Sequence, residues 1–558
     1  MIIDLIGINA KYIHSNPAVY SLRACAGKYK ESVRIREFTI NQRMEEIRQE
    51  IYLGRPDVLA FSCYIWNISL IKELIADLGK ILPATDIYLG GPEVSYCAEA
   101  VLSKNPAVKG ILIGEGEVSF AKLVSCYADE TKEDSEQALR EVPGLVTRDF
   151  ANEAGALPDL ASIPFWYKQE GCAGVPAEFE NRILYYESSR GCPFSCSYCL
   201  SSIDKRVRFR PMEMVKEELD FFLSNKVKQV KFIDRTFNAN PTRALEIWSY
   251  LKEHDNGVTN FHFEIAADII TKEELECLGK MRPGQVQLEI GVQTTNPETL
   301  REIRRTTDME KLRRNVEILR GFQNMHLHLD LIVGLPYEDM ASFIRSFNEV
   351  YAMGADDLQL GFLKVLHGSY MEEMRDTYGI VSEEKEPYEV LSTNWISYED
   401  VIRLKKIEEM LSLYANSGQF ANTIAALEKC FPTPFEMFDA LAGFYEKKGY
   451  FVQTPARSRR YEVLLEFVEE ALPEKKDHFE DLLTLDFYLR ENPKSRPAFA
   501  KGPLLPQKRS ALAHVEYFGT FRNQKGEKGQ YLLFDYTQRD PVTGNATVTE
   551  TDETCGLR

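Results

Sequence analysis

Three cysteines with the spacing C-x₃-C-x₂-C are the feature that most constrains this chain. Cys192, Cys196 and Cys199 follow directly after residues 182–187, an aromatic and aliphatic run that predicts a β-strand. Thiolates are the ligands that iron–sulfur clusters take, usually four to a cluster. Three thiolates from one loop would leave one iron of a cubane open, and an open coordination position indicates chemistry rather than scaffolding. The spacing therefore predicts a reactive iron–sulfur site in this loop.

Zinc and unliganded thiols are the two alternatives for the same loop. Zinc prefers paired C-x₂-C units and four ligands that close its coordination sphere, and no second pair of cysteines lies nearby in the sequence. Three free thiols in a tight turn would need no ligand at all. Both alternatives stay open at this point, although the spacing favours a cluster.

At residues 188–199 (S-S-R-G-C-P-F-S-C-S-Y-C) the chain resembles the radical S-adenosylmethionine (SAM) superfamily. In that family three cysteines hold a [4Fe–4S] cluster, and the amino and carboxylate groups of SAM chelate its fourth iron. The resemblance implies that Cys192, Cys196 and Cys199 are the ligands. It also places Tyr198 at the aromatic position that lies near the adenine of SAM in the family.

Strands and helices alternate through residues 181–385, the segment that we assign to a radical SAM barrel. Besides the strand before the cysteines, the sequence predicts strands at 230–233, 261–267, 286–292, 328–333 and 358–365. Six such units suit the partial (β/α)6 barrel of the family, in which the carboxyl ends of the strands build the active site. The resemblance places Asp234 and Asn238 near SAM. It places Gln293 and the turn that begins at Gly334 beside the ribose or adenine.

Residues 1–130 predict an α/β domain with a doubly wound, Rossmann-like parallel sheet. The runs 2–8, 57–63, 86–89 and 110–113 are typical of buried strands, and 69–82 has helical spacing. Ligands of such sheets bind beyond the carboxyl ends of the strands. Two glycine-rich turns, 90–93 (G-G-P-E) and 114–117 (G-E-G-E), follow strands there, and their missing side chains would let a ligand approach the backbone. Tight turns alone would also explain each of them.

These turns, placed ahead of the cysteines, resemble the cobalamin-binding domain of B12-dependent radical SAM enzymes. The residues that the resemblance implies for cobalamin are Gly90, Gly91, Glu93, Gly114, Glu115 and Gly116. Such domains carry D-x-H-x-x-G after the first strand, where the histidine is the lower cobalt ligand. Residues 12–17 (Y-I-H-S-N-P) keep His14 but lack the aspartate that would orient its ring. We therefore expect cobalamin without its benzimidazole base and without a bond to His14, its lower face met by water, Tyr12 or Tyr64.

The remaining segments carry no chemistry that the sequence identifies. Residues 131–180 predict a linker, and 541–558 predict a flexible tail. Residues 386–540 predict a mainly helical domain that resembles the uncharacterised C-terminal domain of some B12-type radical SAM proteins. Its expected helices are 398–414, 419–430, 434–448 and 460–471, followed by a hairpin of 517–522 and 530–537.

Composition limits the partners and the compartment. Eleven cysteines, scattered apart from the three, do not form a disulfide framework and suit a reducing cytoplasm. No apolar run approaches the roughly 18 residues of a membrane span, and the first residues lack the basic start of a signal peptide. The net charge of −18 disfavours broad binding to phosphate backbones, although basic clusters at 205–210 and 457–460 keep RNA as an alternative partner.

The resemblance implies reductive cleavage of SAM to a 5′-deoxyadenosyl radical, with an external electron donor. Methylation of an unactivated carbon through methylcobalamin is the leading expected reaction, on a small molecule or natural product. B12-dependent cyclisation or rearrangement without methyl transfer is one alternative, and radical SAM modification of RNA is another. A non-catalytic redox or cobalamin sensor is the competing class, and it would require a fourth protein ligand that closes the cluster.

Overall fold

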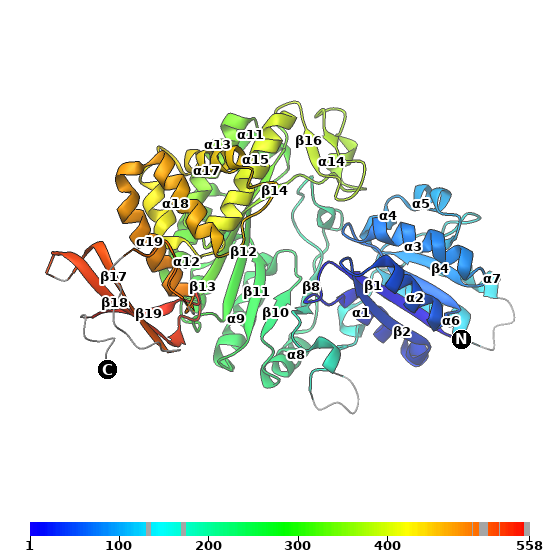
Figure 1. The fold of residues 1–558 in the computed structure, drawn as a ribbon. Coiled ribbons are helices and arrows are strands. Elements are labelled where there is room, and N and C mark those ends of the chain that lie inside the picture. Colours follow the sequence, from blue (N-terminus) through cyan, green and yellow to red (C-terminus); the bar gives the residue numbers. More distant parts are fainter. Residues whose placement is uncertain (130–134, 169–173, 494, 502–511, 524, 552–558) are drawn as a thin grey trace.

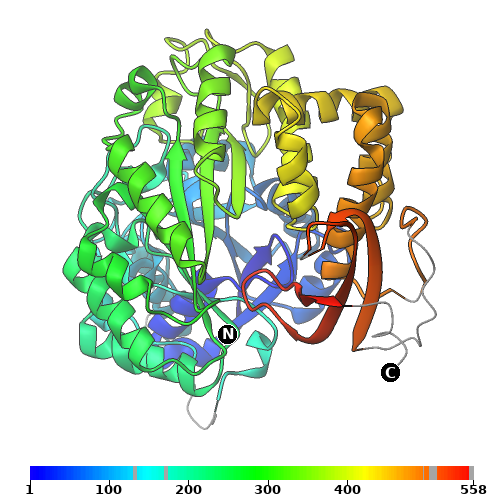
Figure 2. The same ribbon diagram turned by 90° about the vertical axis from the view of Figure 1, so that its left-hand side faces the viewer.

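The computed structural model describes residues 1–129, 135–168, 174–493, 495–501, 512–523 and 525–551. Along the chain it forms an α/β domain, a partial barrel, and a helical C-terminal part that ends in a small sheet (Figure 1). The α/β domain and the C-terminal part lie on different sides of the barrel (Figures 1 and 2). None of the described helices is long and apolar enough to cross a membrane.

The first sheet confirms the predicted doubly wound domain. Its strand order is β2-β1-β3-β4-β5-β6, and β1 to β5 are parallel. These strands are β1 (Ile3–Asn9), β2 (Val33–Thr39), β3 (Val58–Ser62), β4 (Asp86–Gly90), β5 (Val108–Leu112) and β6 (Leu145–Val146). The helices are α1 (Pro17–Cys25), α2 (Met44–Gly54), α3 (Ile68–Ile81), α4 (Pro92–Ser95), α5 (Ala98–Lys104) and α6 (Gly116–Ala128).

Every residue of β1 is buried because its side chains enter two separate apolar clusters. Ile3 and Leu5 join the cluster that holds residues of α1 and α6, whereas Ile6 and Ile8 join the cluster that holds residues of α2 and α3. A continuous apolar strand of this kind requires cover on both faces. The pattern of β1 therefore follows from its central place in the sheet.

Two strands of this sheet were not expected from the sequence. β2 alternates apolar residues with arginines, and Arg34 Nε and Arg36 Nε contact the buried carboxylate of Asp4 at 2.7 and 3.0 Å. β6 lies in the segment 131–180, and it adds antiparallel to β5. Residues 145–146 of the expected linker are therefore part of the first sheet.

The second sheet has the six parallel strands that the sequence predicts, in the order β7-β10-β11-β12-β13-β14. They are β7 (Leu184–Tyr186), β10 (Gln229–Phe232), β11 (Asn260–Ile265), β12 (Val286–Gln293), β13 (Met325–Val333) and β14 (Asp357–Phe362). The main outer helices are α8 (Met212–Ser224), α9 (Pro241–Glu253), α10 (Lys272–Leu278), α12 (Met309–Phe322) and α13 (Met340–Tyr351).

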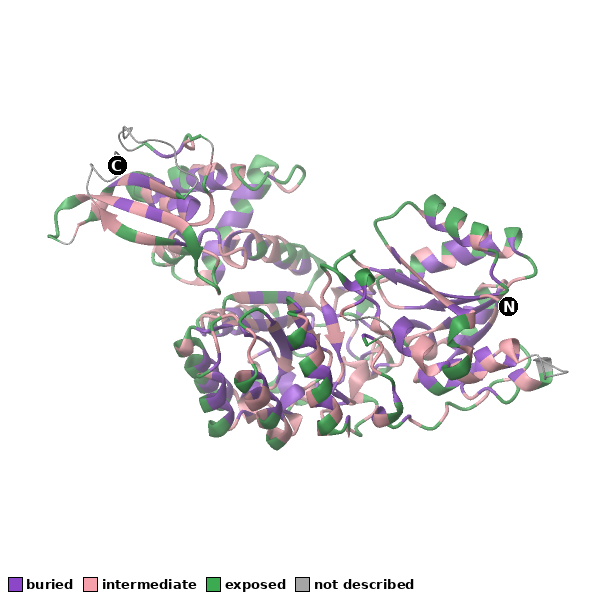
Figure 3. Ribbon diagram, turned by 90° about the horizontal axis from the view of Figure 1, so that it is seen from below, coloured by how far each residue is buried: buried purple, intermediate pink, exposed green. Residues whose placement is uncertain are grey.

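Buried and half-buried residues alternate along β12 and β13. The buried set, such as Leu329, packs under the helices, which leaves Glu289, His328 and Asp330 on the concave side. Figure 3 shows the same division, with buried residues along the strands and exposed residues on the outer helix faces. The inside of this partial barrel is therefore a polar wall rather than an apolar core.

The C-terminal part contains the predicted helices and one more. They are α15 (Tyr398–Met410), α16 (Ala421–Glu428), α17 (Pro434–Lys448), α18 (Arg459–Ala471) and α19 (Lys476–Arg490), of which α19 was not expected. Asn416, between α15 and α16, protects the edge of the barrel sheet. Its amide nitrogen donates to the Leu358 carbonyl at 2.8 Å, and its amide oxygen accepts from the Leu358 N–H at 3.0 Å. An edge strand otherwise leaves such backbone groups unpaired.

The small sheet confirms the predicted hairpin and corrects the predicted tail. β17 (Ala513–Arg522) pairs antiparallel with β18 (Lys528–Arg539), which pairs with β19 (Ala546–Thr551). The expectation of a flexible tail is wrong for residues 546–551, because A-T-V-T-E-T alternates and its partner strand continues past the hairpin. Residues 552–558 of that tail lie outside the described residues.

Candidate active site

The loop that carries the three cysteines is closed at its base. β8 (Ser189–Arg190) and β9 (Arg208–Phe209) pair antiparallel on either side of it. Gly191 has φ 101°, and a β-carbon there would clash with the Arg206 carbonyl, so only glycine fits this turn. The Ser197 N–H donates to the Ile303 carbonyl at 3.0 Å, which ties the middle of the loop to the barrel.

The donor set of the loop fits the predicted cluster. Cys192 and Cys196 are buried, Cys199 is half-buried, and all three thiols are free. Burial, together with the neighbouring thiols, raises the pKa of Cys192, although a contact with Thr236 Oγ1 at 3.7 Å opposes this. No three His, Cys, Asp or Glu side chains of the described residues converge on one metal-ion position. Thiols that bind three different irons of a cluster need not converge in that way.

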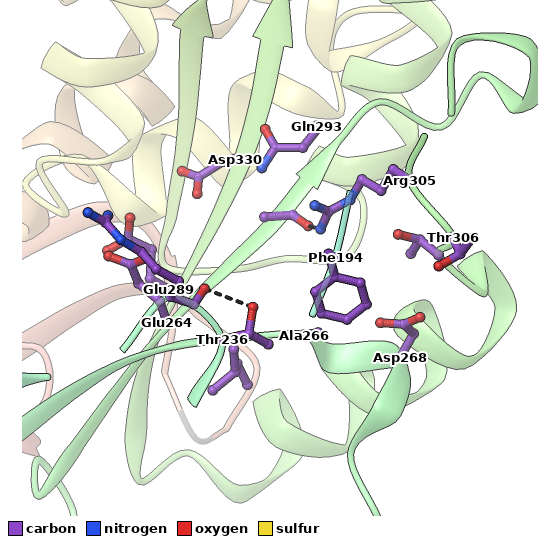
Figure 4. Close-up of a pocket in the computed structure, with 14 residues that line it drawn as sticks. Phe194, Thr236, Glu264, Ala266, Asp268, Glu289, Gln293, Arg305, Thr306 and Asp330 are labelled. Atoms are coloured by element: carbon purple, nitrogen blue, oxygen red, sulfur yellow. Dashed lines mark hydrogen bonds between the residues drawn. The ribbon is translucent and has the colours of Figure 1, made fainter. Parts of the chain in front are cut away.

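A cavity of about 150 Å³ lies beside this loop, at the carboxyl ends of β10 to β13 (Figure 4). Its walls are mostly polar and come from these strand ends, from the cysteine loop and from the chain before α12. The lining residues are Phe194, Arg235, Thr236, Glu264, Ile265, Ala266, Asp268, Glu289, Gly291, Gln293, Arg305, Thr306, Thr307 and Asp330. The position agrees with the general rule for ligand sites on parallel barrels.

Arg305 connects this cavity to the cysteine loop, and the sequence contained no motif that pointed to it. Its guanidinium donates to the Gly291 carbonyl and lies 3.7 Å from Cys196 Sγ and 3.5 Å from the Tyr198 hydroxyl. Burial lowers the pKa of Arg305, but Tyr198 and Cys196 raise it overall, so the side chain stays charged. A fixed cation next to Cys196 favours the thiolate that a cluster requires.

The concave wall below the cavity carries a network of charged side chains. Glu289 accepts from Lys231 at 3.0 Å and contacts His262 Nε2 at 2.9 Å. Burial opposes these two partners, but together they lower the pKa of Glu289 to about 2. Burial raises the pKa of Glu264, and Glu289 raises it further. The wall therefore mixes a firmly ionised carboxylate with one that takes up protons more readily, which suits a polar ligand.

Of the residues predicted to lie at SAM in the barrel, only Gln293 lines this cavity. It has φ 73°, and its side-chain oxygen is buried without a hydrogen-bond partner, as expected of a group that awaits a ligand. Tyr198 lies beside Arg305 and packs against a small apolar cluster around Leu335. Its contact with adenine stays a prediction.

Asp234 and Asn238 do not line the cavity, although Arg235 and Thr236 between them do. The buried Asp234 accepts from the Ser188 N–H at 2.9 Å, and the hydroxyls of Ser188 and Ser189 also donate to it. Burial raises the pKa of Asp234 to about 6 against these donors. Asn238 bonds to both backbone groups of Ala266. Both side chains therefore support the backbone around the site rather than face it.

Gly334 likewise does not line the cavity. It has φ 90°, and a β-carbon there would lie 2.7 Å from Val390 Cγ1. The turn is thus tightly packed against a later segment of the chain. Its role beside the ribose or adenine stays a prediction.

Packing or backbone conformation inside the α/β domain requires glycine at three of the four positions predicted to face cobalamin, Gly90 being the exception. Gly91 has φ 115°, and a β-carbon there would clash with the Cys63 carbonyl. A β-carbon at Gly116 would lie 2.9 Å from Leu22, and at Gly114, which has φ 79°, 3.4 Å from Ala154. At Gly90 the nearest atom would be 3.6 Å away, an ordinary contact. The expected reason, approach of a ligand to the backbone, is therefore not needed to explain these turns.

Glu93 and Glu115, also predicted at cobalamin, reach out of the domain instead. The Tyr388 hydroxyl donates to Glu93. Glu115 accepts from Arg190 at 2.7 Å and also from Arg208, the two residues that close the cysteine loop.

Two more carboxylates join Glu115 in its contact with Arg190. Glu117 accepts from Arg190 at 2.8 Å, and Glu187 accepts from it twice, at 2.9 and 2.7 Å. We call Arg190, Arg208, Glu115, Glu117 and Glu187 the arginine node. It joins the cysteine loop to the first turn of α6.

The residues predicted around the lower face of cobalt lie near the boundary with the barrel. His14 Nδ1 is 2.6 Å from the Tyr185 hydroxyl, and burial, Lys11 and Lys231 lower the pKa of its ring. Tyr12 is exposed, with the Arg182 guanidinium 4.9 Å from its ring centre. These positions leave their contact with cobalamin a prediction.

Tyr64 follows β3 and stacks on Trp66, with ring centres 4.4 Å apart. Burial raises the pKa of Tyr64, and Arg235 of the cavity is among the charges that oppose this. The carboxyl end of the first sheet faces the barrel, because Glu115, which follows β5, accepts from Arg190 and Arg208 at the base of the cysteine loop.

The second sheet is a six-stranded parallel partial barrel with three cysteines after its first strand, and it lies beside a doubly wound α/β domain. This combination defines a radical SAM protein with a B12-type domain. Family models agree with this division. Residues 3–124 match the B12 binding domain, 186–350 match the radical SAM superfamily, and 376–532 match a protein family of unknown function (DUF4080). The chain therefore combines a B12-binding domain and a radical SAM domain with an uncharacterised C-terminal domain.

Two curated relatives are similar to parts of this chain. The chain is 26% identical over 358 residues to the cobalamin-dependent radical SAM methyltransferase TokK of Streptomyces tokunonensis, which covers 60% of this chain and 51% of that protein. It is 22% identical over 342 residues to an anaerobic magnesium-protoporphyrin IX monomethyl ester cyclase of Rubrivivax gelatinosus, covering 59% and 60%. The chain thus spans about half the length of TokK.

Among solved structures, the fold is similar to that of the cobalamin-dependent SAM radical enzyme OxsB with aqua-cobalamin bound. The TM-score is 0.57 at 15% identity, over 87% of this chain and 79% of that one. At this identity the likeness shows the fold alone.

Proposed function

We propose that this chain is a cobalamin-dependent radical SAM enzyme that methylates an unactivated carbon of a small molecule or natural product. The observation that carries the proposal is the place of the cysteine loop. It borders a polar cavity at the carboxyl ends of the barrel strands, and Arg190 at the base of the loop donates to Glu115, which follows the last parallel strand of the B12-type sheet. The name of TokK, a methyltransferase, supports methyl transfer.

The chain's own residues would divide the work as follows. Cys192, Cys196 and Cys199 would hold three irons, and Arg305 would keep a positive charge beside Cys196. Gln293, with its unpaired oxygen, would take a polar group of SAM. When bound, the cluster, SAM and cobalamin would supply the radical and methyl-transfer chemistry, while the protein binds, orients and excludes water. An external electron donor in a reducing cytoplasm belongs to the same proposal.

Cyclisation without methyl transfer is the second candidate, because the relative from Rubrivivax gelatinosus is named a cyclase. RNA is a weaker candidate for the substrate. Three arginines near the basic cluster at 457–460 are paired: Arg457 with Glu491 at 2.8 Å, Arg459 with Glu462 at 2.5 Å, and Arg496 with Glu516 at 2.7 Å. Paired arginines contribute little to a phosphate-binding surface.

The test is anaerobic incubation of reconstituted protein with SAM, a chemical reductant and hydroxocobalamin. Formation of both 5′-deoxyadenosine and S-adenosylhomocysteine supports methyl transfer, and 5′-deoxyadenosine alone favours cyclisation or rearrangement. Cys196→Ala should abolish both products and lower the iron content. Cys277→Ala, a buried cysteine on α10 outside the loop, should retain both. Full iron content and activity in Cys196→Ala would overturn the cluster assignment.

A further inference from the structure

The region of unknown function begins with a hairpin that lies between the two other domains. Its strands are β15 (Val381–Ser382) and β16 (Val390–Ser392), which pair antiparallel. The residues between these strands reach the α/β domain. β16 lies beside the residues that come directly after β14. We call residues 381–392 the clasp.

On the barrel side, the clasp is held by backbone hydrogen bonds and apolar packing. The Val390 N–H donates to the Leu363 carbonyl at 2.8 Å, and the Val365 N–H donates to the Tyr388 carbonyl at 3.1 Å. Val390 also belongs to the apolar cluster that contains Leu335, and Tyr198 of the cysteine loop packs against that cluster. The clasp therefore shares a core with the cysteine loop, which borders the proposed SAM site, and with the turn after β13.

On the other side, the clasp binds the α/β domain through two side chains. The Tyr388 hydroxyl donates to Glu93, in the turn after β4, and lies 3.0 Å from Glu386 Oε1. Glu386 in turn accepts from Lys72 Nζ at 3.0 Å and from the Ser69 hydroxyl, both on α3. These contacts join the clasp to two elements at the carboxyl end of the first sheet.

The central contact of the clasp is shielded from water. Tyr388 is 6% exposed and Glu93 is 8% exposed. A tyrosine hydroxyl has one proton to donate, yet two carboxyl groups lie against this one. Burial raises the pKa of Glu93, and the hydrogen bond from Tyr388 opposes this shift. A buried hydrogen bond of this kind is specific in geometry and costly to leave unmade.

We propose that the clasp positions the B12-type domain over the mouth of the barrel, with Tyr388 and Glu386 as the positioning residues. This gives a role to the first part of the region of unknown function. It rests on the proposed function in one respect, because the distance that the clasp would set is that between cobalamin and the cluster. The physical contact itself exists without either group.

The first test uses hydrogen–deuterium exchange of the full-length protein without cofactors. Tyr388→Phe keeps the ring and removes only the hydroxyl. We expect amides of α4, which contains Glu93, and of α5, which follows it, to exchange roughly tenfold faster, because a buried hydrogen bond is lost. Glu384→Gln is the matched control, since Glu384 is exposed on the same hairpin and has no hydrogen bond or ion pair among the described residues. Unchanged exchange in Tyr388→Phe would overturn the proposal.

The second test measures the distance between cob(II)alamin and the reduced cluster by pulsed electron paramagnetic resonance. We expect one narrow distance in the parent and in Glu384→Gln, and a broad distribution in Tyr388→Phe and Glu386→Gln. Glu386→Gln keeps size and shape, so it serves if Tyr388→Phe does not fold. A narrow, unshifted distance in both variants would contradict the positioning role. If the parent shows no cob(II)alamin signal, the proposed function fails, and the exchange experiment still decides whether the clasp exists.

Discussion

Two of the contacts that join the B12-type domain to the rest of the chain differ in kind. The arginine node consists of five charged side chains, and three carboxylates share the single guanidinium of Arg190. The clasp depends on one hydroxyl, that of Tyr388, backed by the apolar packing of Val390. Both start from a glutamate that follows a glycine-rich strand end. A glutamate in the same local sequence can therefore take part in a redundant ionic contact or in a single buried hydrogen bond.

Removal of Arg190 should lower the stability of the protein more than any other change to these two contacts. Arg190→Met leaves Glu117 and Glu187 without their cation in a mostly buried site, whereas Glu115 keeps Arg208. We expect a loss of about 3–5 kcal/mol in the free energy of unfolding, measured in urea. Iron content should also fall, because Arg190 closes the base of the cysteine loop. Arg206→Met is the control: the side chain of Arg206 is 74% exposed and pairs with Asp204, so its loss should cost under about 1 kcal/mol. Equal effects of the two changes would contradict the node.

Single carboxylates of the node should be less critical, because two others remain on Arg190. Glu117→Gln and Glu187→Gln should each cost about 1–2 kcal/mol of stability. The two variants should differ in where the structure loosens, because Glu117 belongs to the B12-type domain and Glu187 to the barrel. We expect faster amide exchange in α6 for Glu117→Gln only. Faster exchange in α6 for both variants would mean that the node acts as one unit and does not bridge two domains.

The two contacts should respond to pH with opposite signs. Burial raises and Arg190 lowers the pKa of Glu117, with a net shift below its ordinary 4.5, so its contribution is present above pH 4.5 and is lost as the pH falls through the folded pKa. Burial raises the pKa of Glu93 above 4.5, so its contribution is full below pH 4.5 and is lost as the pH rises through the folded pKa.

This difference can be measured by urea unfolding at a series of pH values. Compared with the parent, Glu117→Gln should lose less stability on acidification. Glu93→Gln should lose less stability as the pH rises above 4.5. The same slope change in both variants would show that one of the two carboxyl groups is in a different protonation state from the one inferred.

The outer ion pair of the clasp should have the smallest effect. Lys72 is 38% exposed where it meets Glu386. Lys72→Gln should therefore cost under about 1 kcal/mol, as exposed pairs do. It should leave the exchange of α4 and α5 unchanged, because the Tyr388 hydrogen bond remains. Lys80→Gln on the same helix, whose side chain is 76% exposed beside Asp77, is the matched control. A marked increase in amide exchange for Lys72→Gln would show that the ion pair of Glu386, and not the hydrogen bond of Tyr388, is the main contact of the clasp.

Local pattern alone predicted both parallel sheets and the cysteine loop. Burial of a strand on one or both faces sets the spacing of apolar residues within a few positions. This spacing made the six barrel strands and the doubly wound sheet recognisable. The cysteine spacing needed no tertiary information, since the three thiols belong to one closed loop. Two of the elements that were missed, β2 and β19, are strands whose polar residues find their partners on neighbouring strands.

The identity of each polar partner was decided by tertiary structure. Asp234, Glu93 and Glu115 all stand at the carboxyl ends of strands, where an acid can face a ligand, its own backbone or another domain. Sequence cannot separate these outcomes, because the donors come from residues far away in the chain: Ser188 for Asp234, Tyr388 for Glu93 and Arg190 for Glu115. Arg305 was missed for the same reason, since its closeness to Cys196 exists only once the barrel has closed around the loop.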